Sequence, residues 1–253
     1  MVAADTLKLL FTLAIFIITL LAGWYPFKKR ISSEHQHFDL PMGETLATGV
    51  FLGAALLHML PDASAEFHQM GYKYPIAFIV AGAVFLLFLW MEHLGQELYE
   101  YHEATHPAFA ILAWAMLSVH ALMLGAALGL NHEHSLIIML FLAIITHKWA
   151  ESFAIAVQLN KSALSTKLSF LFFLAFSFMT PLGIFIGWYF GHKVNTNSLF
   201  DPILMAASAG TFLYLGTLHG LERCVMVERC CNLKYFSFVI IGFLLMAGVA
   251  FYV

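Results

Sequence analysis

The sequence is poor in charged residues. Asp, Glu, Lys and Arg make up 11% of its 253 residues, while hydrophobic residues make up 61%. A soluble domain has about 25% charged and about 45 to 50% apolar residues, so this chain cannot cover a surface that faces water on all sides. The composition excludes an ordinary soluble protein and indicates one that spans a membrane.

Other scarce or missing features exclude further classes of protein. The three cysteines fall in one short segment without a C-x-x-C pattern, which argues against a disulfide framework (Cys224, Cys230 and Cys231). The net charge of −3 and the short clusters of Lys and Arg leave no basic surface for nucleic acid. No G-x-x-x-x-G-K-[ST] motif is present, which argues against an ATP-driven pump.

Long apolar segments fill most of the sequence. A helix needs about 20 mostly apolar residues to cross a bilayer, and eight segments meet this requirement. We therefore predict an all-α, polytopic membrane protein with eight transmembrane helices, in a single domain over residues 1–253. The predicted spans are Leu7–Phe27, Glu44–Asp62, Pro75–Gly95, Ala108–Leu130, Leu136–Leu159, Leu168–Phe190, Pro202–Glu222 and Tyr235–Val253.

The distribution of Lys and Arg predicts the orientation in the membrane. Eight of these residues fall in the odd-numbered connections between spans and two in the even-numbered ones. Because cytoplasmic connections hold the excess of positive charge, the odd-numbered ones are predicted to be cytoplasmic and both termini to lie outside. The short connections and few disulfide candidates favour a bacterial inner membrane.

Histidine is abundant for so apolar a chain, with 13 His against 12 Lys and Arg together. In the fifth span His147 and Glu151 are one helical turn apart, which puts both on one helical face where one cation could contact both. Their neighbour Lys148 is also within the span, where a charge costs about 2.5 to 3.5 kcal/mol to insert. A buried His that hydrogen-bonds to a Glu is the structural alternative.

The fourth span has a second histidine, His120, at the depth of His147. A single His on an apolar face is usually a core residue, but two His and one Glu at one depth on consecutive helices form a set of metal ligands. His120, His147 and Glu151 are the candidate metal ligands, and they suit Zn²⁺ with an open fourth position or Fe²⁺ with open sites. The metal is the candidate substrate, and no resident cofactor is indicated.

Three further features are candidates for supporting roles. His58 and Asp62 are four residues apart at the outer end of the second span, where ions could enter, although Asp62 could also be a simple interfacial group. His219 lies toward the cytoplasmic end of the seventh span. In the sixth span Pro181 predicts a helix kink that frees the carbonyl of Ser177, either for packing alone or for a polar partner.

The chain resembles the ZIP family of divalent metal transporters. Five motifs in the order of the family carry the resemblance: residues 49–52 followed by 58–63, the His120 segment, the His147 segment, 180–183 and 209–214. The resemblance implies an eight-helix transporter, commonly a homodimer embedded in membrane lipid. It also implies that Zn²⁺, Fe²⁺ or related ions pass into the cytoplasm through a site on helices 4 and 5.

Some positions depart from the pattern of the family. Ala121 stands where the family has a polar residue, Leu124 where it has Glu, and His219 where it often has Glu. The fifth span matches a His-Lys version of the motif, with Lys148 after His147. We therefore expect one metal ion, with Lys148 substituting for the charge of a second.

Three functions remain open from the sequence. The favoured one is a secondary transporter that moves a divalent cation, Zn²⁺ before Fe²⁺, into the cytoplasm by alternating access. The second is an intramembrane metalloenzyme, although no H-E-x-x-H motif is present. The third is a transport-impaired relative that senses metal, suggested by Leu124 and Lys148.

Overall fold

The structure is a computed structural model that describes residues 2–32, 40–99, 107–191, 199–218, 220–221 and 232–251. Among these residues all regular secondary structure is helical, which confirms the predicted all-α class. The helices are α1 (Val2–Ser32), α2 (Pro41–Ala54), the π-helical turn η1 (Ala55–Met59), α3 (Leu60–Gln69), α4 (Ile76–Tyr99), α5 (Pro107–Leu130), α6 (His134–Lys161), α7 (Thr166–Ser177), α8 (Met179–Gly191), α9 (Phe200–Tyr214) and α10 (Leu233–Ala250).

Seven helical segments of the described residues are long and apolar enough to cross a membrane, and they correspond to seven of the predicted spans. The remaining span, Pro202–Glu222, corresponds to α9 and the π-helical residues 215–218, while Glu222 lies outside the described residues. The second span runs from Pro41 to Gln69 and is longer than predicted. Its extension α3 mixes polar and apolar residues, so hydropathy alone ended the span too early.

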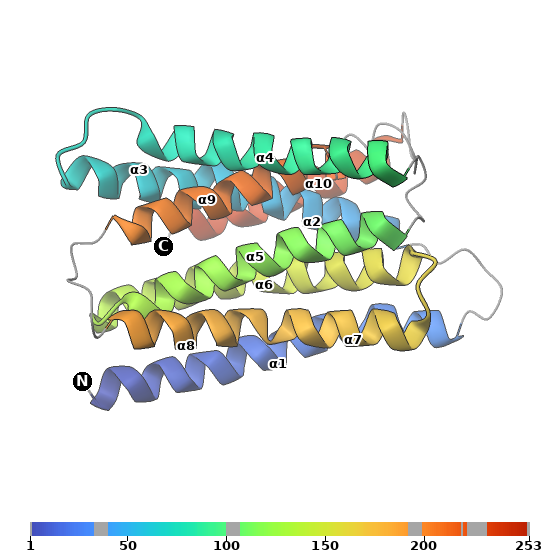
Figure 1. The fold of residues 1–253 in the computed structure, drawn as a ribbon, viewed down its shortest axis with the longest axis horizontal. Coiled ribbons are helices and arrows are strands. Elements are labelled where there is room, and N and C mark those ends of the chain that lie inside the picture. The colour runs from blue at the N-terminus through green and yellow to red at the C-terminus, as the bar shows by residue number, and fades with distance from the viewer. Residues whose placement is uncertain are drawn as a thin grey trace.

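The helices form two bundles (Figure 1). In the first bundle α5 packs on α8, α1 packs on α6, and α7 continues into α8. In the second bundle α2 packs on α10, and α4 and α3 pack on α9. The bundles meet where α5 contacts α9 and where α6 contacts α2, so residues on these faces lie between them.

Small residues fix the position of α5 in the first bundle. Gly125 and Gly129 of α5 face Gly183 and Gly187 of α8, and the backbones approach so closely that a Cβ at any of these positions would overlap with the other helix. Helices in membranes use such spacing because lipid offers no hydrophobic drive for association and close packing must replace it. The contact holds the α5 backbone firmly one turn beyond His120.

The helix that contains Pro181 is interrupted. α7 ends at Ser177 and α8 begins at Met179, two residues before Pro181. Proline cannot donate a hydrogen bond to the carbonyl four residues earlier, which is that of Ser177. At the interruption, Phe178 donates its N–H to the Ala175 carbonyl at 3.2 Å, and Leu182 donates to the Phe178 carbonyl at 2.9 Å.

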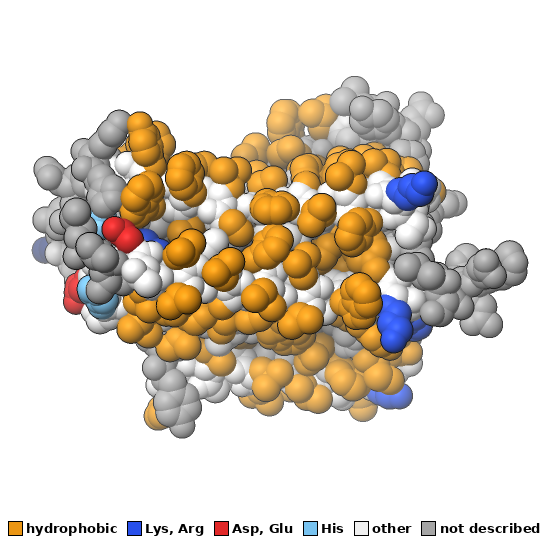
Figure 2. All heavy atoms as spheres, turned by 90° about the horizontal axis from the view of Figure 1, so that it is seen from below, with side chains coloured by type: hydrophobic (Ala, Val, Ile, Leu, Met, Phe, Trp, Pro, Cys, Tyr) orange, Lys and Arg blue, Asp and Glu red, His pale blue; other side chains and the backbone are white. Residues whose placement is uncertain are grey.

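The outer surface suits a bilayer. Figure 2 shows hydrophobic side chains over the middle of one face, with Lys and Arg side chains at its right-hand end and a mixture of acidic, His and basic side chains at its left-hand end. The chain is an integral membrane protein. Both marked termini lie toward the left-hand end of Figure 1, opposite the end where α6 ends and α7 begins. Lys28, Lys29, Lys161, Lys167 and Lys234 lie near the ends of α1, α6, α7 and α10.

Candidate metal centre

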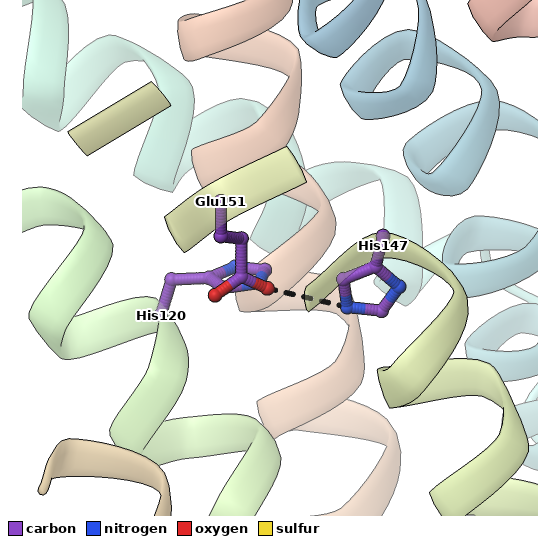
Figure 3. Close-up of side chains that lie close together, drawn as sticks. All are labelled: His120, His147 and Glu151. Atoms are coloured by element: carbon purple, nitrogen blue, oxygen red, sulfur yellow. Dashed lines mark ion pairs between the residues drawn. The ribbon is translucent and has the colours of Figure 1, made fainter. Parts of the chain in front are cut away.

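His120, His147 and Glu151 come together where α5 meets α6. One donor atom of each lies within 4.8 Å of the others, and all three side chains are buried. The Glu151 carboxylate oxygen Oε1 is 3.3 Å from His120 Nε2 and 3.4 Å from His147 Nε2. Figure 3 shows the three side chains pointing toward one another. The i, i+4 spacing on α6 and the antiparallel course of α5 produce this arrangement.

The donor atoms that face one another have no hydrogen-bond partners. His120 Nε2, His147 Nε2 and Glu151 Oε1 are all buried and unsatisfied. More than about 90% of buried polar groups in proteins have a partner, so three orphaned groups around one point need an explanation. A cation at that point would satisfy all three. The two His–Glu contacts, at 3.3 and 3.4 Å, are long for hydrogen bonds between charged groups.

Lys148 contacts the other carboxylate oxygen. Its Nζ lies 2.7 Å from Glu151 Oε2 and 4.6 Å from the centre of the Phe176 ring, and its side chain is 2% exposed. Glu151 therefore has Oε2 bound to an internal cation and Oε1 directed at the two imidazoles. A buried carboxylate is stable only with such compensation.

Helix α9 of the second bundle holds the His120 ring. His120 Nδ1 lies 2.6 Å from Thr211 Oγ1 and 3.2 Å from the Ser208 carbonyl oxygen. The imidazole also stacks on the Phe212 ring, with 3.9 Å between ring centres and 20° between planes. One candidate ligand is thus oriented by a helix that carries neither of the other two.

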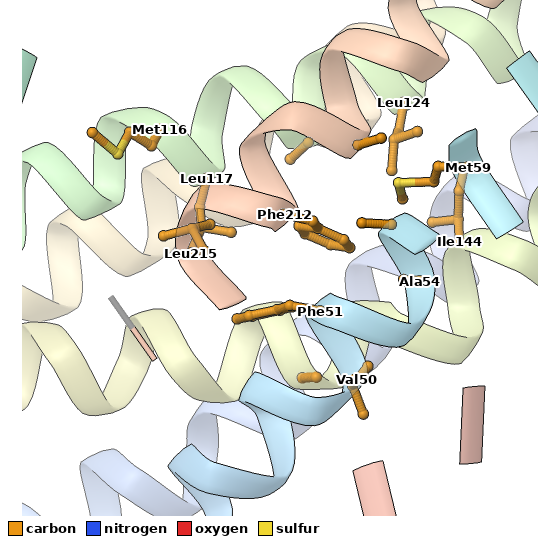
Figure 4. Packing of buried hydrophobic residues seen from close by; sticks show 14 of the residues in the cluster. Val50, Phe51, Ala54, Met59, Met116, Leu117, Leu124, Ile144, Phe212 and Leu215 are labelled. Atoms are coloured by element: carbon orange, nitrogen blue, oxygen red, sulfur yellow. The ribbon is translucent and has the colours of Figure 1, made fainter. Parts of the chain in front are cut away.

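Apolar side chains close the centre toward the Lys-rich end, which the sequence predicts to be the inner one. The Phe51 and Phe212 rings lie 4.8 Å apart, and Figure 4 shows them with Leu117 and Leu215 beside them. Beyond them a small cavity of about 40 Å³ is lined by Glu44, Thr48, Phe51, Leu117, Leu215 and Gln158, among others. At its edge Lys161 Nζ forms an ion pair with Glu44 at 2.7 Å, which links α6 to α2.

The opposite end, which the sequence predicts to face outward, has a larger cavity of about 300 Å³, here called the outer cavity. It is lined by His58, Asp62, Glu66, Asn131 and Asp201, together with apolar residues. His58 Nδ1 lies 2.7 Å from Asp62 Oδ2, and Asn131 donates to Asp201 Oδ2 at 3.2 Å. The candidate pair His58 and Asp62 therefore lines an acidic cavity rather than the centre.

An apolar layer separates this cavity from the centre. Leu124 follows His120 by one turn on α5, and Ile144 precedes His147 by about one turn on α6. Both are buried, and Figure 4 shows them close to Met59. Leu124 thus occupies the outer side of the centre. The candidate His219 lies outside the described residues.

The sequence interpretation missed several residues. Glu66 and Asp201 line the outer cavity, yet only the spacing of Glu66 four residues after Asp62 hinted at this. Ser208 and Thr211 contact His120, and nothing in their own segment indicates it.

Comparison with known proteins identifies the family. The family model described as "ZIP Zinc transporter" matches residues 5–109 and 100–250. The chain belongs to the ZIP family. It is a membrane transporter of divalent metal ions and not an enzyme, so the metalloenzyme alternative does not hold.

The match to ZIP proteins extends over whole chains. Zinc transporter ZIP2 of Mus musculus is 26% identical and the alignment covers 94% of this chain and 95% of the relative. Zinc transporter ZIP1 of Takifugu rubripes is 24% identical, with coverage of 96% and 97%. Zinc transporter ZIP2 of Homo sapiens is 25% identical, with coverage of 94% and 95%. These relatives are eukaryotic, and the bacterial inner membrane and the homodimer stay predictions.

Proposed function

We propose that the protein carries Zn²⁺ into the cytoplasm through a site formed by His120, His147 and Glu151. The observation that carries the proposal is the set of buried, unpartnered donor atoms that face one point on α5 and α6. Two imidazoles and one carboxylate form a ligand set found in zinc sites, with a fourth position left for water. The names of the relatives also support zinc, and Fe²⁺ is the second metal to test.

The position of the centre supports transport by alternating access. It lies between the two bundles, with the outer cavity on one side and the small inner cavity on the other. A relative movement of the bundles would open the layer of Leu124 and Ile144 or the layer of Phe51 and Phe212. We place the Lys-rich end in the cytoplasm and both termini outside. A potential of 100 mV, inside negative, would then favour entry of a dication by about 4.6 kcal/mol.

We further propose that each protomer holds one metal ion at a time. A two-metal centre needs bridging carboxylates to offset two dications, but Leu124 is apolar and Glu151 already forms an ion pair with Lys148. The ammonium of Lys148 supplies the positive charge that a second ion would bring. The homodimer that the family resemblance implies would then carry two ions.

Zinc uptake by proteoliposomes tests this function. Purified protein in lipid vesicles should accumulate ⁶⁵Zn²⁺ when the inside is made negative, and a competing chelator outside should stop the uptake. Empty vesicles and vesicles with the His147→Ala variant are the controls. If wild-type protein binds Zn²⁺ but gives no accumulation, the transporter proposal is wrong and the sensor alternative is favoured.

The carboxylates of the outer cavity should act on capture rather than on translocation. Neutralising two of them in the double variant Glu66→Gln, Asp201→Asn should raise the KM for Zn²⁺ about three- to tenfold and leave the maximal rate unchanged, because an acidic cavity concentrates cations. High salt should shrink the difference. Glu133→Gln is the matched control, since Glu133 is exposed and accepts a hydrogen bond from Ser135. A lower maximal rate with unchanged KM would contradict a capture role.

A further inference from the structure

Among the three candidate ligands, His120 has hydrogen-bond contacts to another helix through its second ring nitrogen. Its Nδ1 faces two oxygen atoms of α9, the Ser208 carbonyl at 3.2 Å and Thr211 Oγ1 at 2.6 Å. All three residues are fully buried, so water does not compete for these contacts.

The two contacts decide which ring nitrogen carries the proton. A carbonyl oxygen only accepts hydrogen bonds, and Thr211 already donates its hydroxyl proton to the Ser208 carbonyl at 2.6 Å. Thr211 Oγ1 therefore accepts from His120, and Nδ1 carries the hydrogen. In the neutral imidazole this leaves the lone pair on Nε2, which faces Glu151 Oε1 at 3.3 Å. This is the tautomer that a metal ion at the centre requires.

The residues that select this tautomer belong to a different bundle from the ligands. His120, His147 and Glu151 lie on α5 and α6 of the first bundle, whereas Ser208 and Thr211 lie on α9 of the second. Outer partners of metal-bound His residues orient the ring and raise its basicity, and their loss costs about 10- to 100-fold in metal affinity. Here that contribution depends on how the two bundles are placed.

We propose that Thr211 is a positioning residue that couples the metal affinity of the centre to the arrangement of the bundles. With α9 against α5, as in this structure, Thr211 holds His120 with Nε2 toward the metal and the site binds tightly. When the bundles shift, His120 loses this partner and the site releases its ion more easily. The inference rests on the proposed transport site and adds to it a residue outside the ligand set.

Three variants test the role of Thr211. Thr211→Val keeps the shape and removes the hydroxyl, Thr211→Ser keeps the hydroxyl, and Thr211→Ala removes it without a branched side chain. Thr217→Val is the matched control, because Thr217 donates to the Leu213 carbonyl at 2.6 Å in the same helical segment. Binding of Zn²⁺ to the full-length protein in detergent is measured by competition with a fluorescent chelator, and the visible spectrum of bound Co²⁺ reports the ligand geometry.

Thr211→Val and Thr211→Ala should weaken Zn²⁺ binding about 10- to 100-fold and shift the Co²⁺ spectrum, whereas Thr211→Ser and Thr217→Val should stay within about threefold of wild type. In uptake assays the two hydroxyl-free variants should raise KM more than they lower the maximal rate. Unchanged affinity in a folded Val or Ala variant would overturn the inference. If Zn²⁺ binding to the wild type were absent, or were unaffected by His147→Ala, the proposed metal site itself would be wrong.

Discussion

Replacing Glu151 by Gln is expected to reduce zinc uptake by proteoliposomes at least about 100-fold. The amide has the size of the carboxylate but no charge, so the centre loses its single anionic ligand while both imidazoles stay in place. Glu151 Oε1 faces both His120 Nε2 and His147 Nε2 within 3.4 Å, so the loss affects the whole ligand set. Uptake of ⁶⁵Zn²⁺ at matched protein density measures the effect.

The same substitution leaves Lys148 without its anionic partner, and an unpaired buried charge costs about 3 to 5 kcal/mol. A loss of uptake could then come from a loss of folding. The double variant Glu151→Gln, Lys148→Met removes both charges together and should restore thermal stability toward that of wild type. It should remain without uptake. If the double variant transported zinc within about threefold of wild type, Glu151 would not be a ligand of the transported ion.

Substitution of Lys148 should change the number of metal ions that the centre binds. In wild type the ammonium lies 2.7 Å from Glu151 Oε2 and competes with metal for this carboxylate. Lys148→Asp reverses the charge at that place and offers a second carboxylate beside Glu151. We expect titration to give one Zn²⁺ per protomer for wild type and two for Lys148→Asp.

Lys148→Met separates charge removal from the gain of a ligand. It should keep one Zn²⁺ per protomer but bind it at least about tenfold more tightly, since a positive charge next to a dication is removed. Tighter binding should slow release and lower the maximal rate of uptake. Two tight sites in wild type, or weaker binding in Lys148→Met, would contradict the proposed role of Lys148.

The parts of this fold that follow local rules could be predicted from sequence. Hydropathy over about 20 residues identified the spans because a bilayer imposes it on each helix separately. It failed at α3, where Asp62 and Glu66 continue the helix of the second span along a polar cavity. Hydropathy also did not predict at which residue the helix breaks before Pro181, although the proline predicted a distortion there.

The candidate site likewise has a part that could be predicted from sequence and a part that could not. His147 and Glu151 are one turn apart on α6, so their shared face follows from helix geometry, and the depth of His120 suggested its place beside them. Thr211 lies 91 residues from His120 in sequence, and their contact depends on how α9 packs against α5. No periodicity encodes such packing. The sequence therefore predicted the three candidate ligands, which lie together in the structure, but not the partners that orient one of them.

The location of the bound ion tests the central proposal most directly. A structure of the protein with Zn²⁺, with anomalous scattering collected at the zinc edge, should give one strong peak at about 2.0 to 2.2 Å from His120 Nε2, His147 Nε2 and Glu151 Oε1. Lys148 should remain beside the other carboxylate oxygen. A zinc peak confined to the outer cavity, with none between these three side chains, would contradict the proposed transport site.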